Sequence, residues 1–225
     1  LPFINAGLPT FIEKPLTTNL TDIRKIERAA NKSGASITVG HIHLHNPAYH
    51  AFKKSVSKIG IIRRLHFEGL ADGPVRPDTS VLWDWGPHGV SMVLDLLKKM
   101  PANVKAWGTR YNVQLELHYS TLTKATIHNS WVWPEKRVQL TAIGNDAMLT
   151  YNDTLPYNKV TLFRGGRKSN PRYNSDSPLA IEMKQFVNTI RTRKRTSDLK
   201  QGVAVVRVLA AAEKSIALDG KAVKP

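Results

Sequence analysis

The first part of the chain has the pattern of a strand, an amphipathic helix and a second strand. Apolar residues recur at helical spacing from Asn19 or Thr21, either of which is a good N-cap residue, to Gly34, a typical helix end. Short apolar runs at 11–13 and 35–40 flank this segment and predict strands. Because strand, helix and strand of these lengths form the unit of a parallel sheet, we interpret this part as the last repeat of one.

The second strand is expected to continue to residue 45. Alternation along it would place His41, His43 and His45 on one face, where they could form a metal site. No carboxylate accompanies this row, and the wall of a polar pocket accounts for it equally well, so we predict no metal. A helix is expected from residue 47 to about residue 58.

After Gly60 the pattern changes to long β-prone stretches, which indicate a mainly antiparallel sheet because most of them are separated only by turn residues. Strands are expected at 61–70, 104–110, 113–119, 121–131, 137–143, 147–151 and 159–163, an exposed loop at 165–172, and closing helices at 178–191 and from Ser197 or Asp198 to 218. The predicted fold class is α/β: an open, mainly antiparallel sheet with helices on one face, preceded by a βαβ piece.

Composition narrows the class of protein further. The chain has 225 residues, 41% of them hydrophobic, and no cysteine, which excludes disulfides, thiolate catalysis and cysteine-ligated metals. No stretch approaches eighteen apolar residues and no secretory signal pattern is present. We therefore expect no membrane association and a cytoplasmic location.

The net charge of +16 points to an anionic partner. Basic residues cluster at 164–172 and 191–195, but no aromatic residues interleave with them and no helix-turn-helix or zinc-finger spacing occurs. The second cluster falls where a helix is expected to end, so compensation of the helix dipole explains it. Nucleic acid is not an expected partner, and anionic-polymer binding stays only as a second alternative.

Residues 81–97 hold the strongest candidate chemistry. Gly86 and Pro87 precede apolar residues at helical spacing, which places His88 near a helix start, and Asp84 lies four residues before it. If the carboxylate reaches the imidazole, it raises the pKa of His88 and fixes its tautomer, and the pair could accept a proton from an alcohol. The alternative is a helix-capping aspartate and a structural histidine.

Five segments in order carry a resemblance to a known family: Glu13-Lys14-Pro15, Val39-Gly40-His41 with Asn46-Pro47, Asp84-Trp85-Gly86-Pro87-His88, Ser130-Trp131-Val132-Trp133-Pro134 and Ser177-Pro178-Leu179-Ala180. Together they resemble the glucose–fructose oxidoreductase/inositol dehydrogenase/MocA (Gfo/Idh/MocA) family of nicotinamide-dependent oxidoreductases over essentially the whole chain. The tryptophan-containing segments look most like members associated with sugars or sugar nucleotides.

The resemblance implies an NAD(P)-dependent dehydrogenase with a Rossmann domain, of which residues 1–45 would be a remnant, and a substrate-binding and oligomerisation domain at 46–225. It implies that Lys14, Asp84 and His88 are catalytic and that Glu13, Lys14 and Pro15 contact NAD or NADP. His43, Asn46, Asp84 and His88 would contact a sugar or sugar-nucleotide substrate. A homo-oligomer, a dimer or tetramer, is expected through the sheet face, because Trp131 and Trp133 should leave an apolar surface there.

Two features depart from the family pattern. The sequence contains no glycine-rich dinucleotide motif, so cofactor binding by this chain alone is not expected. Gly89 stands where this branch commonly has an aspartate. The first departure keeps open an alternative, a truncated non-catalytic module for oligomerisation or sugar binding.

Overall fold

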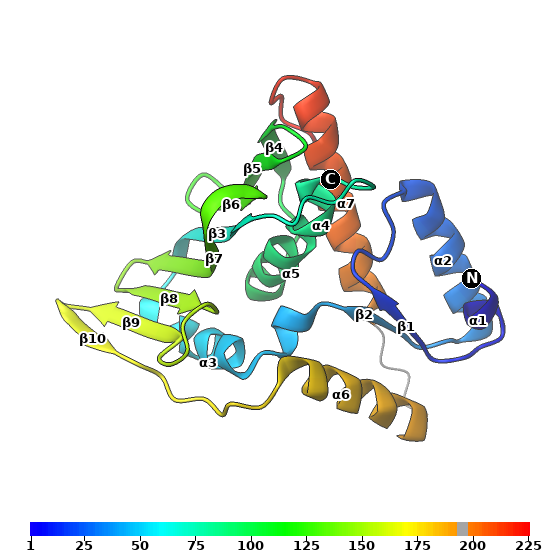
Figure 1. Cartoon of the computed structure of the whole chain (residues 1–225), viewed down its shortest axis with the longest axis horizontal. Helices are drawn as coiled ribbons and strands as arrows, with labels where there is room; N and C mark the ends of the chain where they lie inside the picture. The colour runs from blue at the N-terminus through cyan, green and yellow to red at the C-terminus, as the bar shows by residue number, and fades with distance from the viewer. Residues whose placement is uncertain (193–197) are drawn as a thin grey trace.

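In the computed structural model, which describes residues 1–192 and 198–225, the N-terminal part is a strand–helix–strand unit (Figure 1). Helix α1 (Pro2–Asn5) precedes strand β1 (Thr10–Glu13). Strand β1 pairs in parallel with β2 (Ile37–Gly40), and helix α2 (Leu20–Ser33) connects the two strands. The Asn19 side chain caps α2 by accepting a hydrogen bond from the Thr21 N–H at 2.8 Å, and Gly34 ends it at a φ of 71°. The predicted strand, helix and strand are confirmed.

The predicted extension of the second strand through the three histidines is wrong. Residues Ile42–His45 form a short 3₁₀ helix, η1, and helix α3 (Pro47–Ser55) follows, continued by η2 (Val56–Ile59). Pairing of β2 with β1 ends at Gly40 opposite Glu13, so the next residues have no partner strand. The Leu44 N–H instead donates to the carbonyl of His41 at 2.9 Å, and the three histidines do not alternate on one face.

The larger sheet has eight strands in the order β10-β9-β8-β7-β3-β6-β5-β4. They are β3 (Ile62–Asp72), β4 (Asn103–Gly108), β5 (Asn112–His118), β6 (Lys124–Ser130), β7 (Val132–Gly144), β8 (Met148–Asn152), β9 (Val160–Arg164) and β10 (Arg167–Ser169). Only β3 and β6 run parallel, and the other neighbouring pairs are antiparallel. The predicted open, mainly antiparallel sheet is confirmed.

Helices cover one face of this sheet (Figure 1). Helix α3 packs against β8 and β9, α5 (Gly86–Leu97) against β3 and β6, and α7 (Leu199–Ala217) against β4. Helix α7 also contacts α2 and β2, so it joins the two sheets through one hydrophobic core. Helix α6 (Pro178–Thr192) lies along η1. This arrangement brings the end of β1, η1 and the start of α5 together.

The other face of the sheet is polar, which corrects the apolar surface expected there. Along β3, Arg64, His66 and Glu68 alternate with buried Leu65 and Phe67 and point to this open face. Trp133 lies there edge-on against His128, but Trp131 is 1% exposed. The chain bends at Trp131 between β6 and β7, so the two tryptophans do not share a face.

The expected loop at 165–172 contains β10, which pairs with β9. Gly165 and Gly166 adopt positive φ angles of 54° and 73° and form the two-residue turn of a hairpin. The second basic cluster falls mostly on residues 193–197, which lie outside the described residues. Within the described ranges, no helix combines the length and the apolar character needed to cross a membrane.

Candidate active site

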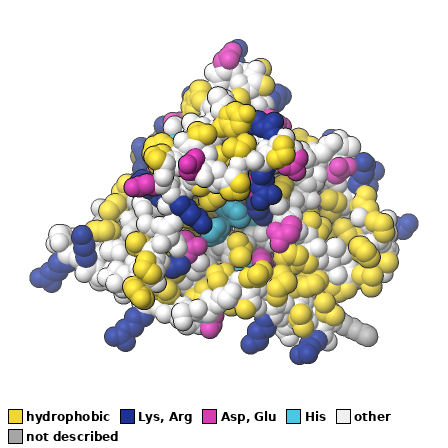
Figure 2. Space-filling view, in the orientation of Figure 1, with side chains coloured by type: hydrophobic (Ala, Val, Ile, Leu, Met, Phe, Trp, Pro, Cys, Tyr) yellow, Lys and Arg dark blue, Asp and Glu magenta, His cyan; other side chains and the backbone are white. Residues whose placement is uncertain are grey.

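A cavity of about 590 Å³ opens where the βαβ unit meets the larger sheet. Its lining residues are His43, Trp85, His88, Lys136, Val138, Asp153 and Thr154. They come from η1, the start of α5, strand β7 and the turn after β8. Figure 2 shows histidine side chains in a hollow with lysine or arginine side chains on both sides of it.

His88 lies in the first turn of α5, as predicted. Its ring meets the ring of His43 edge-on, with 4.8 Å between centroids, and that of Trp85 at 6.1 Å. Its Nδ1 is buried and has no hydrogen-bond partner. Burial, together with His43, Lys14 and His41, lowers the pKa of His88 well below its usual value, so the ring is neutral at neutral pH.

Asp84 does not form the predicted dyad with His88. It is the last residue of helix α4 (Val81–Asp84), and its Oδ1 lies 3.0 Å from the Lys14 Nζ. The same ammonium donates to the Asp84 carbonyl at 2.6 Å, and the Nε of Arg76 lies 3.3 Å from Asp84 Oδ2. Lys14 and Arg76 therefore bind the carboxylate in place of the imidazole, and the pKa of His88 is lowered instead of raised.

A second carboxylate, Asp153, lies in the cavity wall. Its Oδ1 accepts hydrogen bonds from Lys159 Nζ at 2.7 Å and from Asn46 Nδ2 at 3.1 Å, and its Oδ2 lies 3.8 Å from His43 Nδ1. Although burial raises the pKa of Asp153, these neighbours hold it below its usual value. The Oδ1 of Asn46 also accepts from the Ala48 N–H, so both ends of this side chain are engaged.

Two of the candidate residues, His43 and His88, line this cavity. Lys14 pairs with Asp84 and lies close enough to His88 to lower its pKa, and Asn46 binds Asp153. Glu13 is exposed, and the hydrogen-bonding contacts of Lys14 and Asp84 do not include it or Pro15. Among the described residues no group of three or more His, Cys, Asp or Glu side chains is placed to hold a metal ion.

Sequence reasoning missed the opposite wall of the cavity, formed by Lys136, Asp153 and Thr154. Asp153 follows the expected strand at 147–151, and Lys136 lies between the expected strands at 121–131 and 137–143. Lys136 and Asp153 come 48 and 65 residues after His88, and no periodic signal links them to it. The pairing of β7 with β3 and β8 brings them there.

A scan against protein-family models finds no match to the chain, and neither does a search of curated proteins. Solved structures do match. A protein described as an oxidoreductase from Magnetospirillum magnetotacticum MS-1 is 30% identical with a TM-score of 0.85, over 93% of this chain and 73% of that one. UDP-N-acetylglucosamine 3-dehydrogenase GnnA from Acidithiobacillus ferrooxidans is 21% identical with a TM-score of 0.83, over 95% and 72%.

An inositol dehydrogenase homolog from Azotobacter vinelandii, solved with NADH and myo-inositol, is 16% identical with a TM-score of 0.81, over 100% of this chain and 73% of that one. At this identity, as for GnnA, the likeness shows a common fold. The open sheet beside a parallel βαβ unit is thus the architecture of an oxidoreductase class. The chain belongs to the glucose–fructose oxidoreductase/inositol dehydrogenase/MocA family.

Proposed function

We propose that this chain is the catalytic and substrate-binding part of an NAD(P)-dependent dehydrogenase that oxidises a hydroxyl of a sugar, a sugar nucleotide or a polyol. The observation that carries the proposal is a neutral, buried His88 that lines the cavity and lies close enough to the Lys14 ammonium for that charge to lower its pKa. A neutral imidazole, which has one unprotonated ring nitrogen, and a nearby cation together favour loss of a proton from an alcohol.

His88 accepts the hydroxyl proton in this proposal. Its Nδ1 is buried while the residue lines the cavity, so Nε2 is the nitrogen that faces the substrate. Lys14 stabilises negative charge on the substrate oxygen, which lowers the cost of removing its proton. Asp84 contacts Lys14 through both its carboxylate and its carbonyl and positions the ammonium rather than the imidazole.

Substrate hydroxyls bind along the wall formed by His43 and Asp153. The Asp153 carboxylate retains acceptor capacity after its contacts with Lys159 and Asn46, because a carboxylate has about four lone-pair sites. Asn46 acts on the substrate through Asp153, whose orientation it fixes.

A bound NAD or NADP would supply the hydride acceptor. The chain offers a fit to its nicotinamide end, because Glu13 ends a strand that runs parallel to its neighbour, Lys14 and Pro15 follow it, and Lys14 lies close enough to His88 to lower its pKa. The sequence contains no glycine-rich motif for the pyrophosphate, and we propose no residue for that part. We propose residues 1–45 as part of the dinucleotide-binding domain and 46–225 as the substrate domain.

The test is a titration of the full chain with NADH and NADPH, followed by turnover assays with myo-inositol and UDP-N-acetylglucosamine. Because the sequence contains no glycine-rich motif for the pyrophosphate, turnover should need NAD or NADP in large excess. Under that condition reduced nicotinamide should form with the native chain, fall at least about a hundredfold in His88→Gln, and stay unchanged in His118→Gln, which alters a histidine paired with Glu116 away from the cavity. Sugar binding with neither cofactor binding nor turnover would contradict the proposal and favour the non-catalytic module, which the missing glycine motif motivates.

We also propose a homo-oligomer through the open face of the eight-stranded sheet. Its support is the row of paired charges there, such as Arg137 Nη1 with Glu68 Oε1 at 3.2 Å, which suits a polar contact. Such a contact should weaken as salt rises. Sedimentation at micromolar concentration tests this, and a strict monomer at low salt would contradict it.

A further inference from the structure

The charges around the cavity do not balance. Two charged side chains, Lys136 and Asp153, line it, and Lys159 pairs with Asp153. Lys14, which lies close enough to His43 and His88 to lower their pKa values, pairs with Asp84, as does Arg76. Both carboxylates already bind cations, Asp84 through Lys14 and Arg76, and Asp153 through Lys159. The lining histidines add no negative charge. The site therefore carries about two positive charges more than negative ones.

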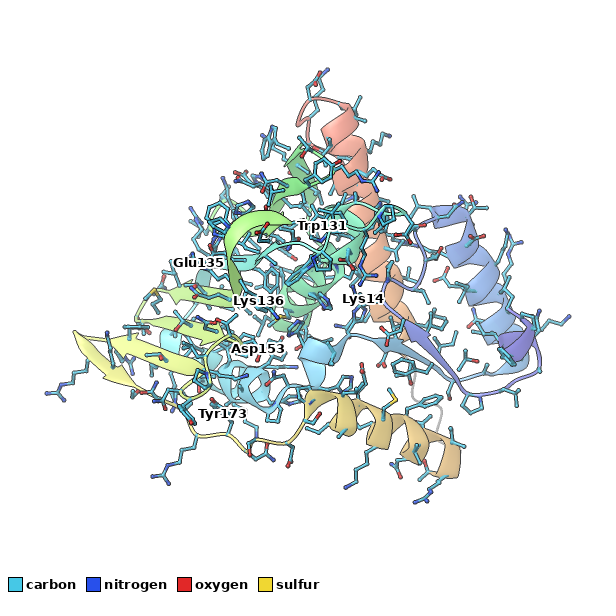
Figure 3. All side chains as sticks on the ribbon, viewed as in Figure 1. Lys14, Trp131, Glu135, Lys136, Asp153 and Tyr173 are labelled. Carbon is cyan, nitrogen blue, oxygen red and sulfur yellow. The ribbon has the colours of Figure 1, made fainter. Side chains whose placement is uncertain are left out.

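Lys136 is the lysine of this site that has no carboxylate partner among the described residues. It lies in the first part of β7, is exposed and lines the cavity. Figure 3 labels it together with Lys14, which follows β1. Its neighbour Glu135 lies 3.4 Å from Arg137 Nη2, and Arg137 also contacts Glu68. In the described part of the chain, no carboxylate lies within ion-pair distance of the Lys136 ammonium.

The neutral histidines do not offset this positive charge. Burial lowers the pKa of His43; Asp153 opposes this shift, while Lys14 and Lys159 add to it. A cavity with excess positive charge and partly buried walls concentrates anions and repels cations. An uncharged polyol would leave this field uncompensated.

We propose that the substrate carries an anionic substituent, a carboxylate or a phosphate, that binds Lys136 while the reacting hydroxyl lies between His88 and Lys14. This inference rests on the proposed function and adds a residue that determines specificity. The anion fixes which hydroxyl reaches His88, because Lys136 and Lys14 hold opposite ends of the bound sugar.

The test measures binding by titration calorimetry of the full chain with glucose, glucuronate, glucose 6-phosphate and UDP-glucose. At least one of the three anionic probes should bind about tenfold or more tightly than glucose, as one charge-assisted contact provides. The tightest of them identifies carboxylate, monophosphate or diphosphate as the preferred group. Equal binding of glucose and all three anions would overturn the inference.

Lys136→Met should remove that preference, while Lys58→Met, an exposed lysine on η2, should keep it. Since Lys136 is exposed, its replacement should leave the circular dichroism spectrum and the unfolding midpoint unchanged. An intact preference in Lys136→Met would refute the assignment. His88→Gln separates this inference from the proposed function, because it should lose turnover yet keep the preference for anions.

Discussion

Replacing Gly89 by alanine should destabilise the protein, although alanine is the better helix former. Gly89 follows His88 in α5, and a Cβ added there would lie 2.5 Å from Cδ1 and 3.0 Å from both Cγ and Cε1 of Phe67. Ordinary carbon contacts need ~3.5–4.0 Å. The aromatic ring is fully buried on the central strand β3, so it can shift only against the close-packed side chains of the core.

Two opposing effects set the magnitude of this change. Alanine in place of glycine inside a helix gains about 1 kcal/mol. Overpacking a close-packed core costs about 1–3 kcal/mol, and three short contacts with a fixed ring place this site at the upper end. The net expectation is a loss of about 2 kcal/mol, which at a typical urea dependence of ~2 kcal/mol/M lowers the unfolding midpoint by roughly 1 M.

Urea unfolding of Gly89→Ala, Phe67→Leu and the double variant measures this. The smaller side chain at position 67 makes room for the Cβ, so the double variant should lose less than the sum of the two single losses. A Gly89→Ala protein as stable as the native one would refute the reasoning. The same contact explains why an aspartate does not fit at position 89, since it would press an unpaired carboxylate against the Phe67 ring.

Three further predictions concern charged and titratable groups. Asp84→Asn should cost about 1–3 kcal/mol in urea unfolding, because Lys14 loses its charged partner in a partly buried site and keeps only neutral oxygen acceptors. Asp22→Asn, which removes an exposed pair, should cost at most about 1 kcal/mol. Burial lowers the pKa of His41 from 6.5 to about 4, so the unfolded chain binds the proton first. His41 should contribute ~3 kcal/mol to the loss of stability as the pH drops from 6.5 to 4, beside the contributions of His43 and His88. His41→Leu should make the fall smaller by that amount, and an unchanged slope would exclude His41 as one of its sources. Burial, with Glu13 and Asp198 nearby, raises the pKa of Glu182 to about 7, so its stabilising protonation is lost as the pH rises through 7. The free energy of unfolding of Glu182→Gln should exceed that of the native protein by up to ~3 kcal/mol at pH 8. An increase of this size already present at pH 4 would contradict this.

Most helices and strands could be predicted because their signals are local. The cap at Asn19, the end at Gly34 and the helical spacing after Pro87 each depend on residues within one or two turns. The 3₁₀ turn η1 could not be predicted in this way. Residues 41–45 have the alternation of a strand, and they fold otherwise because β1 ends at Glu13 and offers them no partner.

The sequence by itself determined the order of the family's segments and placed Lys14 at a strand end and His88 at a helix start. Only the tertiary structure decided that Asp84 pairs with Lys14, seventy residues away, and that Lys136 and Asp153 close the cavity from the far sheet. The physical reason is that periodicity reports which face of an element is buried. Which charges then meet depends on how separate elements pack, and here two cations hold the carboxylate that was expected to serve the histidine.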